Sequence, residues 1–278
     1  ALIMQHRAKK RFGQNFLVNT NIIDHIIDSI NPEAGELMIE IGPGLGAMTK
    51  PLLSHLDRLN VIELDRDVIP ILTRNCTLAN HDNKDKLIVN EADVLKFDFA
   101  AFHAEQLKNH DYPADTRLRV VGNLPYNIST PVLFHLLKTR HLIKDMHFML
   151  QKEVVDRIVS APGNKHYGRL SVMLQAYCSA QFLFEVPPHA FQPAPKVNSA
   201  ILRLVPGTPF ENQIDVFSDF EKLVRQAFSQ RRKTLKNTLK SICSADRIEQ
   251  AGLKKSHRAE ELSIADFVSL YRSIYKNS

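Results

Sequence analysis

The stretch LMIEIGPGLG at residues 37–46 decides the fold. Its first five residues are apolar apart from one acid, which is typical of a buried strand. The turn GPGLG at 42–46 supplies backbone without bulky side chains, and AMTKPLLSHL at 47–56 indicates a helix after it. A strand, a glycine turn and a helix in this order predict the first unit of an α/β fold.

The same alternation continues downstream. Further strands are expected at 59–64, 87–95, 117–121 and 146–151, and helices up to about Leu78 and at 130–138, 153–160 and 170–178. An amphipathic helix is also predicted at 20–30, capped by Asn19 or Thr20. Short apolar strands that alternate with amphipathic helices predict a doubly wound, Rossmann-like parallel sheet with helices on both faces.

The C-terminal part of the chain has a different pattern. Strands expected at 180–186 and 199–205 bracket a proline-rich connection, so we expect an antiparallel pair that closes one edge of the sheet. The segment PGTPF is the expected linker, which divides the chain into a first domain at 1–206 and a small helical domain at 207–278. Amphipathic helices of that second domain are expected at 216–230, 231–242 and 265–275.

The composition favours a soluble protein of the reducing cytoplasm. Of the 278 residues, 44% are hydrophobic and 24% are charged, and no apolar run approaches the roughly 20 residues that cross a bilayer. The basic N-terminus is followed by no apolar stretch of signal-peptide length. Cys76, Cys178 and Cys243 form no CxxC pair, and the histidines show no ligand spacing, so neither a disulfide framework nor a metal site is expected.

The charge of the chain suggests a polyanionic partner. The net charge is +6, and cations without intervening acids gather at 7–11 and at 231–240. The second cluster has apolar Leu235 and Leu239 four residues apart, so one face can pack while the other meets phosphates. A merely solvated basic face is the alternative interpretation. The residues expected to meet the phosphates of such a partner are Arg231, Arg232, Lys233 and Lys236.

Acids are expected at the same sheet edge as the glycine turn. Glu63 and Asp65 end the second strand, 17 and 19 residues after Gly46, where an acid can accept both hydroxyls of a ribose. Asp93 ends the third strand, within reach of an adenine amino group. Acids at strand ends are often only helix caps, but three at one edge favour a site for an adenosine-bearing cofactor.

Both NAD and S-adenosylmethionine fit that description. A dinucleotide seats its pyrophosphate on a helix N-terminus and favours the longer spacing GxGxxG, whereas here the position three after Gly44 is Ala47. A sulfonium cofactor has no phosphate and demands less of the loop. Pro43 in the turn and the missing glycine therefore favour methyl transfer.

The segment GNLPYNIST at 122–130 follows the fourth strand. Methylation of an exocyclic amine requires that its lone pair be freed from conjugation with the ring. The side-chain oxygen of Asn123 and the main-chain carbonyl of Leu124, which Pro125 restrains, can both accept hydrogens of such an amine. Tyr126 offers a flat face on which a base can stack. A type I turn with Tyr126 as core filler is the alternative.

Six motifs together are similar to those of the bacterial small-subunit ribosomal RNA adenine N6,N6-dimethyltransferases. They are GQNFL (13–17), IEIGPGLG (39–46), VIELD (61–65), EADVL (91–95), GNLPYNIST (122–130) and FQPAPKVNSA (191–200), and they span nearly the whole chain. The resemblance implies dimethylation of two adjacent adenines in a hairpin near the 3′ end of 16S ribosomal RNA, with S-adenosylmethionine as cofactor. It also implies a cytoplasmic monomer that takes part in small-subunit biogenesis.

The resemblance further implies roles for single residues. Asn15 and Leu17 are expected to cover the cofactor, and Phe191 to sandwich the target base opposite Tyr126, although Phe191 also fits a core position. The remaining cofactor contacts that it implies are Gly42 and Gly44 in the turn, Glu63 at the ribose, Asp93 at the adenine, and Asn123 at both the cofactor and the amine.

Three rival functions remain open from the sequence. A related dimethyltransferase acts on large-subunit RNA and gives macrolide resistance, but the long C-terminal part and FQPAPKVNS fit the small-subunit enzymes better. A DNA adenine methyltransferase would carry a target-recognition region, which we do not find. A non-enzymatic assembly factor would not need the intact motifs around Gly42, Glu63 and Asn123.

Overall fold

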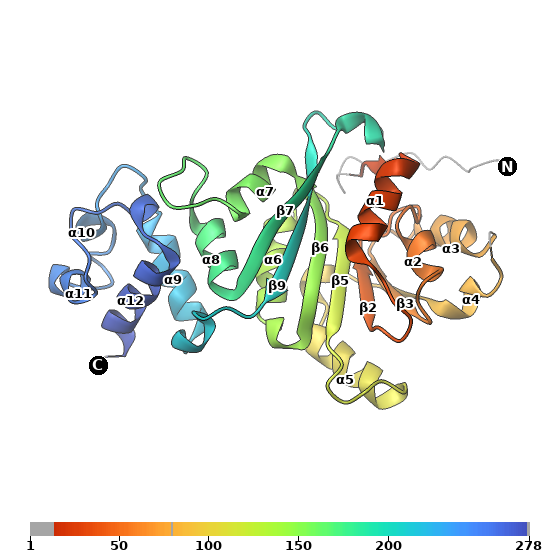
Figure 1. Ribbon diagram of the computed structural model, residues 1–278, viewed down its shortest axis with the longest axis horizontal. Helices are drawn as coiled ribbons and strands as arrows, with labels where there is room; N and C mark the ends of the chain where they lie inside the picture. The colour runs from red at the N-terminus through yellow and green to blue at the C-terminus, as the bar shows by residue number, and fades with distance from the viewer. Residues whose placement is uncertain (1–13, 79, 277–278) are drawn as a thin grey trace. The chain divides into compact units, whose positions relative to one another are not determined.

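The computed structural model describes residues 14–78 and 80–276, and its main feature is a seven-stranded sheet in the order β4-β3-β2-β5-β6-β9-β7 (Figure 1). The strands are β2 (Met38–Ile41), β3 (Leu59–Glu63), β4 (Leu87–Glu91), β5 (Leu118–Asn123), β6 (Ile143–Gln151), β7 (Cys178–Val186) and β9 (Ser199–Pro206). Strands β2 to β6 pair in parallel, and β9 pairs with β6 in antiparallel orientation. The predicted fold class and the late strand pair at one edge are confirmed.

Helices cover both faces of this sheet, since all four residues of β2 are buried. They are α1 (Thr20–Ile30), α2 (Thr49–Leu53), α3 (Ile69–Leu78), α4 (Asn83–Lys86), α5 (Phe99–Asn109), α6 (Ser129–Leu137), α7 (Lys152–Ile158) and α8 (Arg169–Tyr177), with short 3₁₀ turns η2 (Val94–Lys96) and η3 (Arg140–Leu142). Helix α1 has the predicted bounds and the predicted cap, because the Asn19 side chain accepts a hydrogen bond from Ile22 N at 3.1 Å. Helix α5, capped by Asp98, was not predicted.

A second, two-stranded sheet joins distant parts of the sequence. Strand β1 (Phe16–Leu17) pairs in antiparallel orientation with β8 (Phe191–Gln192), which follows the 3₁₀ turn η4 (Pro188–Ala190). Leu17 and Phe191 are both buried in a core that also contains Ile26 and Ile27 of α1. Neither strand was predicted from the sequence.

The side chain of Arg119 on β5 connects four segments of the chain through hydrogen bonds. It donates to both carboxylate oxygens of Asp145 at 2.9 and 3.1 Å and to Glu36 at 2.7 Å. It also donates to the main-chain carbonyls of Ile30 and Asn31, where α1 ends. A cation is favourable at a helix C-terminus, and these bonds use all five donors of a guanidinium that is only 6% exposed.

The chain divides into two compact units. Residues up to 152 group with 182–204, and residues 153–181 group with 205–278. The second unit contains α7, α8, the 3₁₀ turns η5 (Glu211–Gln213) and η6 (Ala259–Glu261), and helices α9 (Phe217–Ala227), α10 (Leu235–Thr238), α11 (Ala245–Gln250) and α12 (Ile264–Tyr275). It is thus larger than the predicted domain at 207–278, because the buried Tyr167 donates its hydroxyl to Leu262 O at 2.6 Å and packs edge-on against Phe228.

The predicted helix at 231–242 is wrong. Residues 231–233 form a turn, and α10 has only four residues. Thr234 is extended, with φ −75° and ψ 161°, and the main-chain N–H groups of Leu235 and Lys236 donate to carbonyls of 257 and 255. Leu235 and Leu239 are nevertheless fully buried, as their spacing indicated.

Two further expectations concern the chain as a whole. Within the described ranges, no helix has both the length and the apolarity needed to span a bilayer. All three cysteines are free thiols; Cys76 and Cys178 are buried. The basic segment Arg7–Arg11 lies outside the described residues.

Replacing Arg119 by Met should cost about 3–5 kcal/mol of stability, because the buried carboxylate of Asp145 loses its partner. Equilibrium unfolding in urea measures the loss. Arg66→Met is the matched control, since Arg66 pairs with Glu91 on the surface and is 84% exposed, and it should cost less than about 1 kcal/mol. Equal losses in the two variants would contradict the assigned role of Arg119.

Candidate active site

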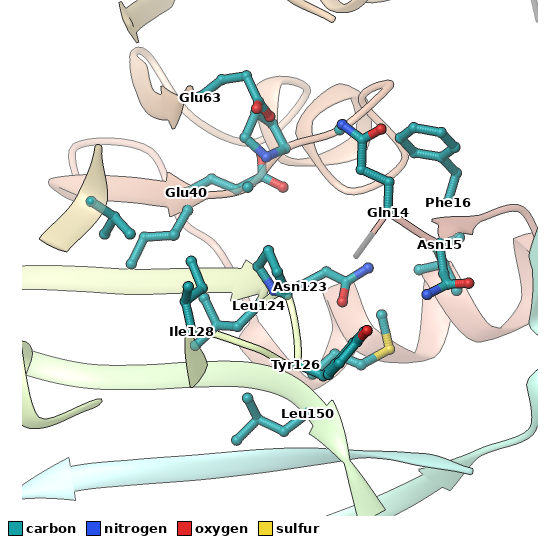
Figure 2. A pocket seen from close by; sticks show the side chains of 18 of the residues that line it. Gln14, Asn15, Phe16, Glu40, Glu63, Asn123, Leu124, Tyr126, Ile128 and Leu150 are labelled. Atoms are coloured by element: carbon teal, nitrogen blue, oxygen red, sulfur yellow. The ribbon is translucent and has the colours of Figure 1, made fainter. Parts of the chain in front are cut away.

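A pocket of about 290 Å³ opens where the order of the strands reverses. Strand β2 lies between β3 and β5, with Ile41 opposite Gly122, so the crevice at their carboxyl ends is where ligands bind in such sheets. Figure 2 shows Glu40 and Glu63 on one side of it, Gln14, Asn15 and Phe16 on another, and Asn123 and Tyr126 between them. All predicted cofactor and catalytic residues line this pocket: Asn15, Leu17, Gly42, Gly44, Glu63, Asp93, Asn123, Leu124, Tyr126 and Phe191.

The glycine turn leaves room that a side chain would fill. Gly42 has φ +65° and Gly44 has φ +56°, a region that residues with a Cβ rarely adopt. A Cβ at Gly42 would lie 3.0 Å from the carbonyl oxygen of Asn123, and one at Gly44 would lie 3.2 Å from the ring of Phe16. The turn is therefore held directly against the ends of β5 and β1.

The structure distinguishes between the two acids at the end of β3. Glu63 lines the pocket and accepts from Asp65 N at 3.0 Å. Burial raises the pKa of Glu63, although main-chain N–H groups of Asp65 and Gly44 lower it. Asp65 is 3% exposed, accepts from Gln14 and Asp67 N, and does not line the pocket. Glu63 is thus the acid that can meet a ligand, whereas Asp65 organises the turn.

Asp93 lies on the same edge but beyond its strand. Strand β4 ends at Glu91, two residues before Asp93 and short of the predicted range 87–95, and Asp93 caps η2 by accepting from Leu95 N at 3.0 Å. It therefore has the helix-capping role that is common for such acids, and it also lines the pocket.

Glu40 is a pocket residue that the sequence did not single out. It is 2% exposed on β2 and accepts from the Thr49 hydroxyl at 2.6 Å. Burial raises the pKa of Glu40 to about 8, and the charge of Glu63 also raises it, while the hydrogen bond from Thr49 lowers it. A signal was present, since an acid inside an otherwise apolar strand is costly without a function.

The NLPY segment presents acceptors to the pocket. In Figure 2 the carboxamide of Asn123 points into the pocket, and among the described residues none forms a hydrogen bond with it. Leu124 is anchored, because its side chain is buried and its N–H donates to Met149 O at 3.2 Å. Tyr126 is 55% exposed and is therefore not the core filler that the alternative interpretation required.

Phe191 fits both roles expected for it, a wall of the pocket and a core position. It is 4% exposed and belongs to the hydrophobic core, yet it lines the pocket. It is the cross-strand partner of Leu17, so the two predicted walls of the pocket are adjacent. Pro195 and Val197 on the loop after β8, and Ser199 at the start of β9, also line the pocket.

The predicted RNA contacts lie in the second unit. Arg231, Arg232, Lys233 and Lys236 are all exposed. The Arg231 guanidinium donates to the carbonyls of Lys165 and Tyr167, which brings the loop that carries Lys165 beside the turn. Lys236 N donates to Lys255 O at 3.2 Å, so a further cation lies next to α10.

Comparisons with known proteins agree with this arrangement. Residues 5–276 match the family model described as "Ribosomal RNA adenine dimethylase". The chain is 50% identical over 266 residues to the "Ribosomal RNA small subunit methyltransferase A" of Pseudomonas fluorescens (strain Pf0-1), covering 96% of this chain and 93% of the relative. A dimethyladenosine transferase from Plasmodium falciparum superposes with a TM-score of 0.75 at 26% identity, covering 92% of this chain and 95% of that one.

A more distant structure shares the fold. The 23S rRNA methyltransferase ErmE superposes with a TM-score of 0.67 at 22% identity, covering 94% of this chain and 99% of that one. The parallel sheet with its glycine turn at the switch point and its antiparallel edge defines a Rossmann-like methyltransferase. The chain belongs to the ribosomal RNA adenine dimethylase family. The expected fold class and enzyme family are confirmed.

Replacing Glu40 by Gln should stabilise the protein increasingly as pH rises. The folded protein holds Glu40 protonated up to about pH 8, whereas the unfolded chain ionises it near 4.5, so unfolding releases a proton between these values and rising pH favours unfolding. Glutamine removes this titration and keeps an oxygen for the Thr49 hydroxyl. We expect similar stabilities near pH 4 and an advantage for the variant on the order of a few kcal/mol at pH 8.

Urea unfolding at pH 4, 6 and 8 measures this difference. Glu105→Gln on α5 changes an exposed acid and serves as the control, with little difference from the parent protein at any of the three values. A Glu40→Gln effect that does not vary with pH would show that the carboxyl is ionised in the folded protein.

Proposed function

We propose that the chain transfers methyl groups from S-adenosylmethionine to the N6 atoms of two adjacent adenines of 16S ribosomal RNA. The observation that carries the proposal is the Asn123 carboxamide, which points into the pocket beside the glycine turn instead of bracing the fold (Figure 2). A family match over residues 5–276 supports the same chemistry. Up to four cofactor molecules are used for the two nucleotides.

The electrostatics of the pocket favour a cationic cofactor. Glu63 and Asp93 line it as acids, whereas Glu40, whose pKa burial raises to about 8, lines it as a neutral carboxyl. A dinucleotide would place its pyrophosphate at the glycine turn, near Glu63, which would repel it. S-adenosylmethionine carries a positive sulfonium, which supplies the electrophilic methyl group. Glu63 would hold the ribose, Asp93 the adenine, and the segment of Asn15 and Leu17 would cover the cofactor.

Asn123 and Leu124 activate the target amine. In the first transfer, the carboxamide oxygen of Asn123 and the main-chain carbonyl of Leu124 each accept one hydrogen of the N6 amine. The nitrogen then becomes pyramidal and directs its lone pair away from the ring. Both acceptors also stabilise the positive charge that grows on this nitrogen during transfer, and their fixed positions contribute through proximity. The methylated ammonium releases its proton to water, so no general base is required.

The base pocket requires an adenine that has left its helix. Extruding it costs a few kcal/mol, part of which is recovered by stacking on an aromatic face. The exposed Tyr126 would supply one such face, and Phe191, which also lines the pocket, would supply the second.

The small ribosomal subunit or its precursor is the proposed partner. The Pseudomonas fluorescens relative is named a small subunit methyltransferase, and it is 50% identical to this chain over 266 residues. Exposed cations of the second unit, with Arg231 beside the loop of Lys165 and Lys236 beside Lys255, would contact RNA phosphates. We further propose that the protein acts as a cytoplasmic monomer during subunit biogenesis.

The direct test is incubation of the protein with undermethylated small subunits and S-adenosylmethionine labelled in its methyl group. Nucleoside analysis should recover the label in N6,N6-dimethyladenosine. Large subunits serve as the comparison substrate. Label in large-subunit RNA alone, or no transfer by the folded protein, would overturn the proposal.

Asn123→Ala should lower the rate of methyl transfer by about 10²–10³, because one of two preorganised acceptors is lost. Single-turnover assays measure the rate, and thermal unfolding should be unchanged, since the carboxamide forms no hydrogen bond with the described residues. Asn109→Ala, which truncates an exposed asparagine outside the pocket, is the matched control. Substantial remaining activity would exclude Asn123 from the chemistry.

Replacing Arg231, Arg232 and Lys233 together by Gln should weaken binding to small subunits and flatten its dependence on salt. Each lost phosphate contact reduces the slope of log K against log salt by roughly 0.7–0.9. A triple Gln variant at Lys84, Lys108 and Lys138, which are exposed positions of the first unit, removes the same charge and should leave the slope nearly unchanged. An unaltered slope in the first variant would show that the turn at 231–233 is only a solvated surface.

A further inference from the structure

The short sheet of β1 and β8 connects the two walls of the pocket. Strand β1 follows Asn15 and contains Leu17, the segment proposed to cover the cofactor, and β8 contains Phe191, proposed to stack on the target base. Leu17 and Phe191 are direct cross-strand partners, 7% and 4% exposed. A displacement of either strand therefore moves a residue of the other wall.

Main-chain hydrogen bonds extend this connection. The carbonyl oxygen of Ala190, the residue before β8, accepts from Val18 N at 2.8 Å and from Asn19 N at 3.2 Å. Asn19 in turn caps α1 through its side chain. The turn η4, which directly precedes Phe191, is thus bonded to the segment between β1 and α1.

We propose that these main-chain bonds position Phe191 and couple the two substrates, so that binding of the cofactor raises the affinity for the target RNA. The inference rests on the proposed function. A ligand that orders β1 also orders β8. The second ligand then binds to a wall that is already ordered, so its binding costs the protein less conformational entropy. Coupling is reciprocal, so the RNA must raise the affinity for the cofactor by the same factor.

The size of the effect can be bounded. Couplings between sites usually lie between about 5-fold and 150-fold, and a pair of two-residue strands should give a value at the lower end, about 5-fold to 10-fold. The bond from Val18 N is the point at which to break the connection, because the Val18 side chain is 48% exposed and outside both strands. Proline at this position removes the N–H donor.

The experiment measures the affinity for S-adenosylhomocysteine, which cannot react, with and without saturating undermethylated small subunits. It also measures the affinity for these subunits with and without saturating S-adenosylhomocysteine. The parent protein and Val18→Ala, which keeps the N–H, should both show a coupling of at least about 5-fold in each direction. Val18→Pro should reduce it to about 1 while its affinity for S-adenosylhomocysteine alone changes less than about 3-fold. Coupling retained in Val18→Pro, or absent from the parent protein, overturns the inference.

A second measurement needs no variant and covers the case in which Val18→Pro does not fold. Hydrogen exchange of the parent protein should slow at both 14–19 and 188–192 when S-adenosylhomocysteine alone is added. Slowing confined to 14–19 overturns the coupling. A parent protein that neither binds S-adenosylhomocysteine nor methylates small subunits would instead overturn the proposed function, so the two failures are distinguishable.

Discussion

The contact between Gly42 and the carbonyl of Asn123 is the constraint on which the rest of the site depends. Strands β2 and β5 pair up to Ile41 and Gly122, and a Cβ on the next residue of β2, Gly42, would lie only 3.0 Å from the carbonyl oxygen of Asn123. The glycine turn and the NLPY segment can therefore lie this close together because Gly42 has no side chain. The carboxyl ends of parallel strands lie at one edge of the sheet, so Glu63 at the end of β3 lies beside the glycine turn as well.

Local signals predicted much of this architecture. The strands of the parallel sheet and the ends that carry Glu63 and Asn123 could be located because each is a short apolar run followed by turn residues. Helix α5 was missed, although Asp98 followed by Phe99 and Phe102 was a readable cap and apolar face. The pair of β1 and β8 could not be found, because two residues have no periodicity and the partner lies far along the chain.

Other errors arose where tertiary contacts outweighed a local pattern. Leu235 and Leu239 have helical spacing and are buried, but the preceding Thr234 is extended because the main chain after it bonds to residues 255 and 257. The burial of Leu235 and Leu239 was therefore predicted correctly, but the helical conformation predicted for 231–242 was wrong. Asp65 and Glu63 could not be separated by spacing, since only the structure shows that Asp65 is occupied by the turn.

The pairing of Phe16 with Gln192 also affects the order in which the protein can be completed during synthesis. A ribosome releases the N-terminal end of a chain first, yet this strand has no partner until the polypeptide has been extended past residue 192. The parallel core can collapse earlier, because its strands follow one another in sequence. A nascent chain would thus form its parallel sheet before β1 met β8, and the pocket would be the last part of this unit to be completed.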